Sequence, residues 1–339
     1  MKFGEIKKIL LIKPRGIGDV VLSTIVIDNL LNFFPSAKID YLTEPFVKPA
    51  IDNIPQINKV LTFSRNEFIF KIIREIRRQN YDIVFDLWTN PKTAQITFLS
   101  GAKYRVGYSY LGRRYAYNIK ATSGRGNHHS AEHNLELLKP FNIPIVSKRI
   151  LFNLDKEKLE EAKVFINYNF SSAKSIVGIL PSGSWKSKRV DTSKWIEICK
   201  ALLKKYAVKF FVIWGPGDEE DSAKIINELN EDAILAPKTD LKLMSAMIKC
   251  CDFIISNDSG PMHIAAALNI PILGIFGPTN PHTHRPYSEN SGFIYKSDLH
   301  CITCDKLECP FNHECMLNLS IEDILNEVDK LAGKILIKN

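Results

Sequence analysis

The stretch "LIKPRGIGDVVLSTIVIDNL" (residues 11–30) starts as a buried β-strand, breaks at two glycines, and resumes as an apolar run behind Asp19. A strand that turns directly into a helix is typical of parallel sheets. A dinucleotide-binding fingerprint would need a third glycine where the chain has Val21, and Asp19 would repel a pyrophosphate. The turn therefore predicts a carboxylate held at a strand end, where it can act as a general base toward a hydroxyl. The alternative role of Asp19 is a helix N-cap.

The same alternation of strand and helix continues along the chain and restarts after about residue 170. We expect a strand, in several cases with the loop that follows it, in each of the stretches 6–14, 37–44, 81–88, 175–183, 208–221, 251–261 and 271–278, with helices at 20–34, 67–79 and 191–206 among them. A chain of 339 residues usually needs two cores. The sequence therefore predicts an α/β fold with two doubly wound parallel sheets, which are Rossmann-like domains facing a cleft. We place the domains at 1–168 and 169–319, followed by a closing helix at 320–339 that opens with Ser-x-x-Asp.

The excess of basic over acidic residues is confined to the first half of the chain. Residues 1–150 carry 23 Lys and Arg against 12 Asp and Glu, whereas residues 151–339 carry 22 against 25. Tyrosines interleave with the basic residues between Asp86 and Glu132, where there is no acidic residue. This pattern fits a solvated basic surface or an anionic partner, and nucleic acid is one candidate, although no nucleic-acid-binding motif is present. No apolar run is long enough for a spanning helix or a secretion signal, so we expect a cytoplasmic protein.

Polar and small residues follow the expected strands of the second half. Ser259 and Gly260 open a helix whose free N–H groups suit a phosphate oxygen. Ser184 and Lys188, in "PSGSWKSK" (181–188), offer a hydroxyl donor and a cation for a second phosphate. Glu219 follows another strand, where its carboxylate could accept from ribose hydroxyls. Together these loops favour a diphosphate ligand, while each loop alone is better explained by turn chemistry, helix capping or solvation.

Several motifs resemble those of the lipopolysaccharide heptosyltransferases. They are "KPRGIGDVVLSTIVIDNLLNFFPSAKIDYLTE" at the N-terminus, "YRVGY" (104–108), "HSAEHNLELL" (129–138), "LPSGSWKSKR" (180–189) and "SNDSGPMHIAAALNIPILGIFGPTNPHTHRP" (256–286). The resemblance covers most of the chain. It implies the two-Rossmann GT-B fold and an inverting, metal-independent transfer of heptose from ADP-heptose to the inner core of lipopolysaccharide. It also implies that an ADP-sugar is the donor substrate, that no cofactor is required, and that the enzyme contacts the cytoplasmic face of the inner membrane.

The resemblance also assigns roles to individual residues. Asp19 becomes the base that deprotonates the acceptor hydroxyl. The donor site consists of Ser184, Lys188, Glu219, Asp258, Ser259, Gly260 and His263, and the acceptor site of Arg15, Gly18, Arg105, Arg113 and Arg114. The chain departs from the family where it has "KRVDTSKW" (188–195) instead of Lys-Arg-Trp-Pro, and where Ser184 replaces a threonine found in several relatives.

Four cysteines, Cys301, Cys304, Cys309 and Cys315, lie within a short C-terminal segment. Their spacing is compatible with a structural zinc or iron–sulfur site, or with a structural cluster of thiols or disulfides. His129 and His133 have the i, i+4 spacing of a helical metal pair, and packing is their alternative role.

Two other functions remain open at this point. A nucleotide-sugar epimerase or hydrolase of the same double-Rossmann plan would turn over the donor without an acceptor. A non-enzymatic protein that binds nucleic acid or an anionic surface would use the basic half of the chain.

Overall fold

The computed structural model describes residues 5–124, 126 and 128–339 and divides the chain into two compact units, Met1–Asn153 (unit 1) and Leu154–Asn339 (unit 2). The division lies ahead of the predicted boundary at residue 168. The helix in between, α6 (Lys156–Asn169), packs along α9 (Leu241–Lys249) and so belongs to unit 2.

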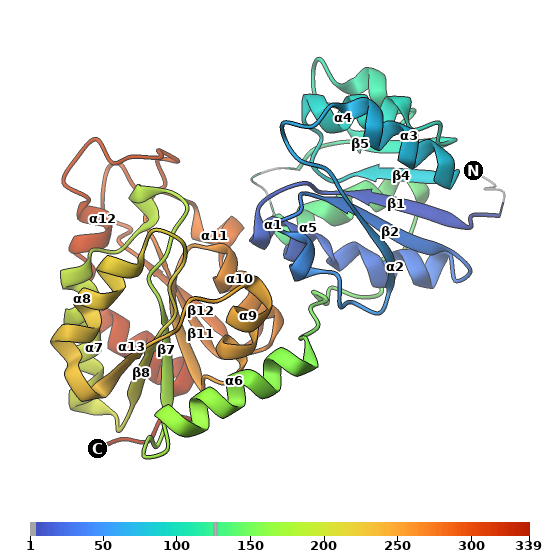
Figure 1. Cartoon of the computed structure of the whole chain (residues 1–339). Coiled ribbons are helices and arrows are strands. Elements are labelled where there is room, and N and C mark those ends of the chain that lie inside the picture. Colours follow the sequence, from blue (N-terminus) through green and yellow to red (C-terminus); the bar gives the residue numbers. More distant parts are fainter. Residues whose placement is uncertain (1–4, 125, 127) are drawn as a thin grey trace. The chain divides into compact units, whose positions relative to one another are not determined.

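Unit 1 is a doubly wound sheet whose paired strands are all parallel, in the order β3-β2-β1-β4-β5-β6 (Figure 1). Its strands are β1 (Lys8–Ile12), β2 (Lys38–Thr43), β3 (Ile57–Thr62), β4 (Ile83–Asp86), β5 (Tyr104–Tyr108) and β6 (Ile119–Ala121). Its helices are α1 (Ile17–Ser23), α2 (Ile25–Phe33), α3 (Ile69–Gln79), α4 (Pro91–Leu99) and α5 (Ser130–Leu135), with short 3-10 turns η1 (Lys48–Ala50), η2 (Arg114–Ala116) and η3 (Glu136–Phe141).

The helices of unit 1 cover both faces of its sheet. α3 and α4 pack on one face, and α1, α2 and α5 pack on the other (Figure 1). The helix expected over 20–34 is two helices, separated at Thr24. The Thr24 hydroxyl donates to the carbonyls of Val21 and Leu151, which ties the break to the end of the unit.

Unit 2 repeats this topology, with the strand order β12-β11-β10-β7-β8-β9 and parallel pairing throughout. Its strands are β7 (Ile176–Leu180), β8 (Lys209–Val212), β9 (Ala233–Leu235), β10 (Phe253–Asn257), β11 (Ile272–Phe276) and β12 (Ser291–Tyr295). Besides α6 and α9, its helices are α7 (Thr192–Lys205), α8 (Glu219–Leu229), α10 (Gly260–Ala267), α11 (Pro281–His284), α12 (Glu314–Leu317) and α13 (Ile321–Ala332), with 3-10 turns η4 (Lys186–Lys188) and η5 (Asn230–Asp232).

The main core of unit 2 lies between the sheet and the helices α7, α8 and α13. Trp195 and Phe210 are fully buried in it, and α13 contributes Ile324 and Val328. The closing helix begins as its sequence predicts, because the Ser320 hydroxyl caps it by accepting from the N–H of Asp323. α13 is therefore an integral part of unit 2 and not a detached terminal segment.

The two sheets confirm the predicted α/β class with two doubly wound parallel sheets. In each sheet the strand order reverses between the first and fourth strands, β1 and β4 in unit 1, β7 and β10 in unit 2. The carboxyl ends of the strands at such a switch point are where doubly wound folds bind ligands. A search of the described residues for a helix long and apolar enough to cross a membrane finds none.

Candidate active site

Asp19 lies at the switch point of unit 1, in the first turn of α1 directly after β1. Its side chain is about half exposed (48%). Gly16 takes the N-cap position of α1, so Asp19 is not the cap of this helix. Gly16 has φ +80°, and a Cβ atom built there would lie 2.3 Å from Oδ2 of Asp19. Only glycine fits this turn without displacing the carboxylate.

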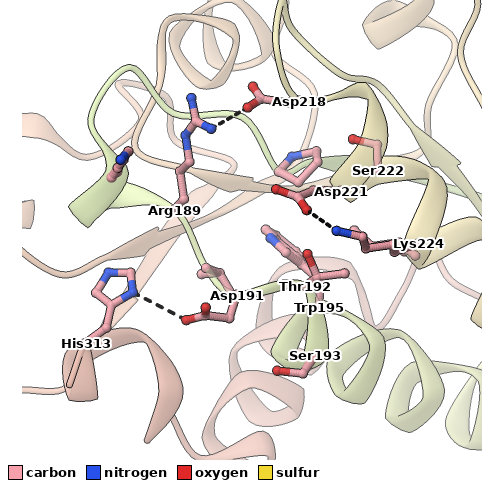
Figure 2. Close-up of a pocket in the computed structure, with 14 residues that line it drawn as sticks. Arg189, Asp191, Thr192, Ser193, Trp195, Asp218, Asp221, Ser222, Lys224 and His313 are labelled. Atoms are coloured by element: carbon pink, nitrogen blue, oxygen red, sulfur yellow. Dashed lines mark hydrogen bonds and ion pairs between the residues drawn. The ribbon is translucent and has the colours of Figure 1, made fainter. Parts of the chain in front are cut away.

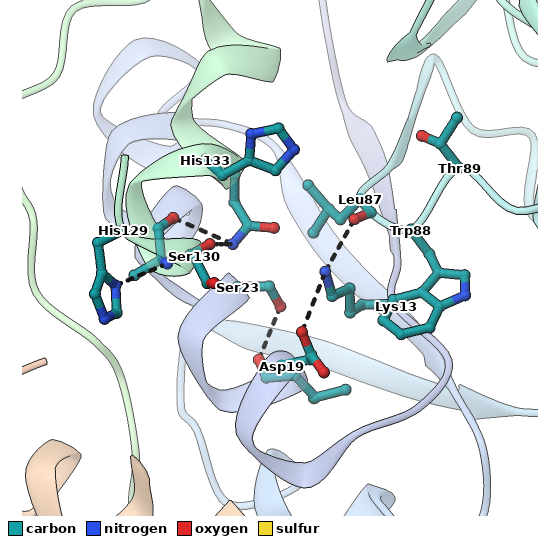
Figure 3. Close-up of polar contacts among 12 residues, drawn as sticks. Lys13, Asp19, Ser23, Leu87, Trp88, Thr89, His129, Ser130 and His133 are labelled. Atoms are coloured by element: carbon teal, nitrogen blue, oxygen red, sulfur yellow. Dashed lines mark hydrogen bonds and ion pairs between the residues drawn. The ribbon is translucent and has the colours of Figure 1, made fainter. Parts of the chain in front are cut away.

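Lys13 is the partner of Asp19 that the sequence analysis missed. Its Nζ atom lies 4.0 Å from Oδ1 of Asp19, donates to the carbonyl of Leu87 over 3.1 Å, and sits 4.9 Å from the centre of the Trp88 ring (Figure 3). Because a buried ammonium group needs such partners, Lys13 is held in place from β4 as well as from β1. The sequence held one signal for this role: Lys13 places a charge immediately after the apolar run of β1.

α5 packs against α1 and brings two histidines to this side of unit 1 (Figure 3). His129 is the N-cap of α5, and its Nδ1 accepts from the N–H of Ala131. The ring of His133 stacks on Tyr108 with 4.4 Å between centroids, and the Tyr108 hydroxyl donates to the His133 carbonyl. These contacts give both histidines a role in capping or packing.

The residues predicted for acceptor binding close to β1 are partly engaged within unit 1. Gly18 is buried inside α1. Arg15 is half-exposed and lies 3.6 Å from the carboxylate of Glu44. Arg105 donates to two backbone carbonyls, including that of Ala116 over 3.0 Å. Arg105 therefore braces the edge of the sheet, whereas Arg15 keeps part of its guanidinium in contact with solvent.

Two further predicted arginines lie at the η2 turn. Arg113 sits over the ring of Tyr110, 5.4 Å from its centre, and Arg114 is exposed at the start of η2. Neither forms an ion pair with a carboxylate among the described residues; Arg114 is exposed, and Arg113 is partly exposed beside Tyr110. Both are available to a negatively charged ligand.

In unit 2 the predicted residues Lys188 and Asp258 come together at the switch point between β7 and β10. Their ammonium and carboxylate groups are 2.7 Å apart, and both side chains are largely buried. The hydroxyl of Thr279 donates to the same carboxylate over 2.6 Å. Burial by itself would raise the pKa of Asp258, but Lys188, Thr279 and the nearby His263 outweigh it and hold that pKa below its ordinary value. Asp258 therefore stays ionised and anchors the lysine.

α10 begins next to this pair. Ser259 occupies its N-cap position with extended backbone, Gly260 is its first residue, and His263 is buried in the following turn. The free N–H groups at the start of an eight-residue helix and the ammonium group of Lys188 are both suited to phosphate oxygens.

The other predicted donor residues are exposed: Ser184 lies on the loop after β7, and Glu219 is the first residue of α8, directly after the loop that follows β8. These loops are tied to each other: the N–H of Gly215 donates to the Ser182 hydroxyl over 2.8 Å. A second tie is the ion pair of Arg189 and Asp218, at 2.5 Å, and Arg189 also donates to the Gly183 carbonyl. The sequence analysis did not find this tie, because its partners lie far apart along the chain.

A cavity of about 600 Å³ opens beside these loops, between the N-terminal turns of α7 and α8 (Figure 2). Arg189 and Asp218 line it, together with Asp191 and His313, whereas the predicted donor residues do not. The cavity therefore adjoins the loops that carry those residues and is lined by the groups that hold the loops in place.

Residues 301–315, here called the cysteine strap, carry the four clustered cysteines. All seven cysteines of the chain lie in the described residues, and each is a free thiol. Burial, reinforced by the three neighbouring thiols of the strap, raises the pKa of Cys315 to about 12. Within the described part of the chain, no group of three or more His, Cys, Asp or Glu side chains is arranged to hold a metal ion, and this includes both the strap and the pair of His129 and His133.

A doubly wound sheet with a lysine and a helix N-terminus at its switch point is typical of proteins that bind phosphorylated nucleotides. The family model that matches the chain over residues 69–314 identifies the kind of protein more closely. The chain belongs to glycosyltransferase family 9 (heptosyltransferase).

Individual relatives agree with this assignment. The chain is 26% identical to lipooligosaccharide heptosyltransferase 2 of Haemophilus ducreyi, across 96% of this chain and 99% of the relative. Among solved structures, a family 9 glycosyltransferase of Veillonella parvula matches with a TM-score of 0.84 at 20% identity, covering 98% of this chain and 99% of that one. The ADP-heptose lipopolysaccharide heptosyltransferase II of Escherichia coli matches with a TM-score of 0.79 at 22% identity, covering 96% and 99%. These matches confirm the GT-B fold and a glycosyltransferase of the heptosyltransferase family.

Proposed function

We propose that this enzyme transfers heptose from ADP-heptose to the inner core of lipopolysaccharide. The names of the relatives support this proposal. The E. coli structure is named as an ADP-heptose lipopolysaccharide heptosyltransferase, and the H. ducreyi relative is named as a lipooligosaccharide heptosyltransferase. The observation that carries it is the pair of Lys188 and Asp258 beside the start of α10. This pair gives unit 2 a fixed cation where the diphosphate of a nucleotide sugar can bind.

In this proposal the donor phosphates bind to Lys188, the hydroxyl of Ser184 and the N–H groups of Ser259 and Gly260. Glu219 accepts from the ribose hydroxyls. Lys188 also stabilises the negative charge that develops on the departing ADP, which needs no metal ion. Asp258 and His263 support this lysine.

Unit 1 supplies the acceptor chemistry. The half-exposed carboxylate of Asp19 accepts the proton of an acceptor hydroxyl as that oxygen attacks the anomeric carbon of the heptose. The bond from this carbon to the phosphate oxygen breaks, ADP leaves, and a single in-line displacement inverts the anomeric configuration. The acidic sugars and phosphates of the acceptor are attracted by Arg15, Arg105, Arg113 and Arg114. The acceptor is a membrane glycolipid, so the reaction takes place at the cytoplasmic face of the inner membrane.

The test is a donor screen followed by a transfer assay. ADP-heptose should raise the melting temperature of the protein more than UDP- or GDP-sugars do. ADP should then be released only when a heptose-free core acceptor is added, and the anomeric proton of the product should report inversion. Release of ADP without an acceptor would instead support the epimerase or hydrolase alternative, and binding of oligonucleotides without binding of ADP would support the non-enzymatic one.

A further inference from the structure

The cysteine strap is hydrogen-bonded to the loop between β7 and α7 (residues 181–191, here called the phosphate loop) at one buried residue, Ser187. The N–H of Ser187 donates to the Leu307 carbonyl over 3.3 Å, and its hydroxyl donates to the Lys306 carbonyl over 2.5 Å. Its own carbonyl accepts from Nε2 of His313 over 2.8 Å. Every polar group of Ser187 is therefore bonded to the strap.

His313 also contacts the phosphate loop at a second residue, Asp191. Its Nδ1 atom lies 3.3 Å from the carboxylate of Asp191, which precedes α7 (Figure 2). The backbone of His313 is left-handed, with φ +58°, and directs the chain into α12. The His313 ring therefore donates to the loop before Lys188 and contacts the loop again after it.

Lys188 follows Ser187 directly and has little local support of its own. It ends η4, a single 3-10 turn of three residues, in which its N–H donates to the Trp185 carbonyl. Its ammonium group lies 4.4 Å from the centre of the Trp185 ring and 2.7 Å from Asp258. An isolated turn is a weak support, so the hydrogen bonds at Ser187 set the position from which the lysine side chain starts.

The other end of the strap is hydrogen-bonded to the turn after β11, next to the residue that contacts Asp258. The N–H of Thr303 donates to the Gly277 carbonyl over 3.2 Å, and that of Asp305 donates to the Pro278 carbonyl over 2.7 Å. The next residue, Thr279, donates its hydroxyl to Asp258. A Cβ atom at Gly277 would lie 2.8 Å from the sulfur of Cys315, so the strap packs tightly on this turn. The strap is thus bonded next to both members of the pair of Lys188 and Asp258.

We propose that the cysteine strap positions the donor site, with His313 and Ser187 as positioning residues for Lys188. The inference rests on the proposed function, in which Lys188 contacts the donor phosphates. Loosening the strap should weaken binding of the donor and leave binding of the acceptor unchanged, because the strap lies within unit 2 and its contacts described here end at the phosphate loop and the turn after β11.

The test compares His313→Ala, His313→Gln and the control His300→Ala. His300 is exposed just ahead of the strap, and its ring packs against the ring of Phe311. ADP binding, measured by titration calorimetry, should weaken about tenfold in H313A, which removes the hydrogen bond to the Ser187 carbonyl and the contact with Asp191. H313Q retains an N–H donor for the Ser187 carbonyl and should recover most of the affinity. H300A should bind ADP like the wild type.

Kinetics separate positioning from a general loss of stability. In H313A the KM for the donor should rise while the KM for the acceptor stays the same. If H313A does not fold, Ser187→Ala removes only one hydrogen bond and should weaken ADP binding about threefold. Unchanged ADP affinity in H313A, or in S187A where that variant is used, overturns the strap proposal alone. A wild-type chain that does not bind ADP overturns the proposed donor site and the strap proposal with it.

Discussion

The two switch points carry the same pair of groups, a buried lysine and an aspartate, and they differ in the exposure of the aspartate. In unit 1 the lysine is buried (10% exposed) and Asp19 is about half exposed, with 4.0 Å between Lys13 and Asp19. In unit 2 the aspartate is buried (5% exposed), and Lys188 lies against it at 2.7 Å. The topology places both pairs at the same point of a repeated fold, so the difference comes from the side chains around them.

The different exposure of the two aspartates suits them to two different chemical roles. A carboxylate that is half in solvent and only loosely paired can take up and release a proton, as a general base must. A buried carboxylate that accepts from a lysine and a threonine is fixed as an anion, and its task is to hold the cation. We therefore assign proton transfer to unit 1 and phosphate binding to unit 2.

The largest expected effect is on turnover in Asp19→Asn. The amide cannot accept the proton of the acceptor hydroxyl, so kcat should fall about 10³-fold, within the range that general bases contribute. Steady-state release of ADP with donor and acceptor present measures it. The control is Asp28→Asn on α2, which removes an aspartate that pairs with Arg149 on the surface of unit 1. Wild-type turnover in D19N would show that another group is the base.

The second effect is on stability and its dependence on pH. Asp258→Asn leaves the ammonium group of Lys188 without its counter-charge and should lower the free energy of unfolding by about 3 kcal/mol at pH 7. The folded state holds the pKa of Asp258 below its ordinary value. The carboxylate therefore stabilises the fold above the unfolded-state pKa of about 3.9, and this contribution is lost as the pH falls through the lower folded-state pKa.

Urea unfolding of wild type and D258N at a series of pH values measures this contribution. The difference between the two proteins should be constant from pH 7 to about 5 and should shrink below about pH 4. A difference that stays the same down to pH 3 would contradict an ionised Asp258 stabilised by Lys188.

The third effect tests the turn that presents Asp19. Gly16→Ala should cost about 1 kcal/mol of stability for its backbone strain and should also push the carboxylate aside, lowering kcat about tenfold or more. Gly112→Ala is the matched control, since Gly112 has φ +78° and nothing within 4 Å of an added Cβ. It should show a similar loss of stability and normal turnover. Equal turnover in the two variants would contradict the contact between Gly16 and Asp19 as the reason for the glycine.

The smallest effect concerns the exposed charge of unit 1. Replacing Arg113 and Arg114 together with alanine should lower kcat/KM for the acceptor about threefold to fivefold at low salt, and the difference should vanish at high ionic strength. The double change Lys174→Ala with Lys204→Ala removes the same charge from exposed positions in unit 2 and should have no such effect. An equal loss in both double variants would indicate a general effect of net charge.

The sequence predicted the fold and the loops well, because both follow from local patterns. Apolar runs of strand length that end in glycine and polar residues marked β1, β7 and β10 correctly. Short or less apolar strands were not predicted, namely β3, β5, β6, β9 and β12, because edge and near-edge strands carry mixed burial. The position of α6 depends on packing against α9, which no local pattern encodes.

In the candidate site, the sequence suggests residues at the strand ends, but it does not reveal the residues that hold them in place. Asp19, Lys188 and Asp258 carry recognisable chemistry at predicted strand ends. The side chains that support them, such as Lys13 and His313, act across long stretches of sequence, and His313 reaches a carbonyl 126 residues away. Such contacts are decided by tertiary packing, so a single sequence does not reveal them.

The most direct test of the division between the two units is ADP affinity, measured by titration calorimetry in Asp19→Asn and Lys188→Met side by side. We predict that D19N binds ADP within about twofold of the wild type, and that K188M binds it at least about tenfold more weakly, because in the proposed function Lys188 contacts the phosphates and Asp19 does not. Wild-type affinity in K188M, or a comparable loss of affinity in D19N, would contradict the assignment of phosphate binding to unit 2 and proton transfer to unit 1.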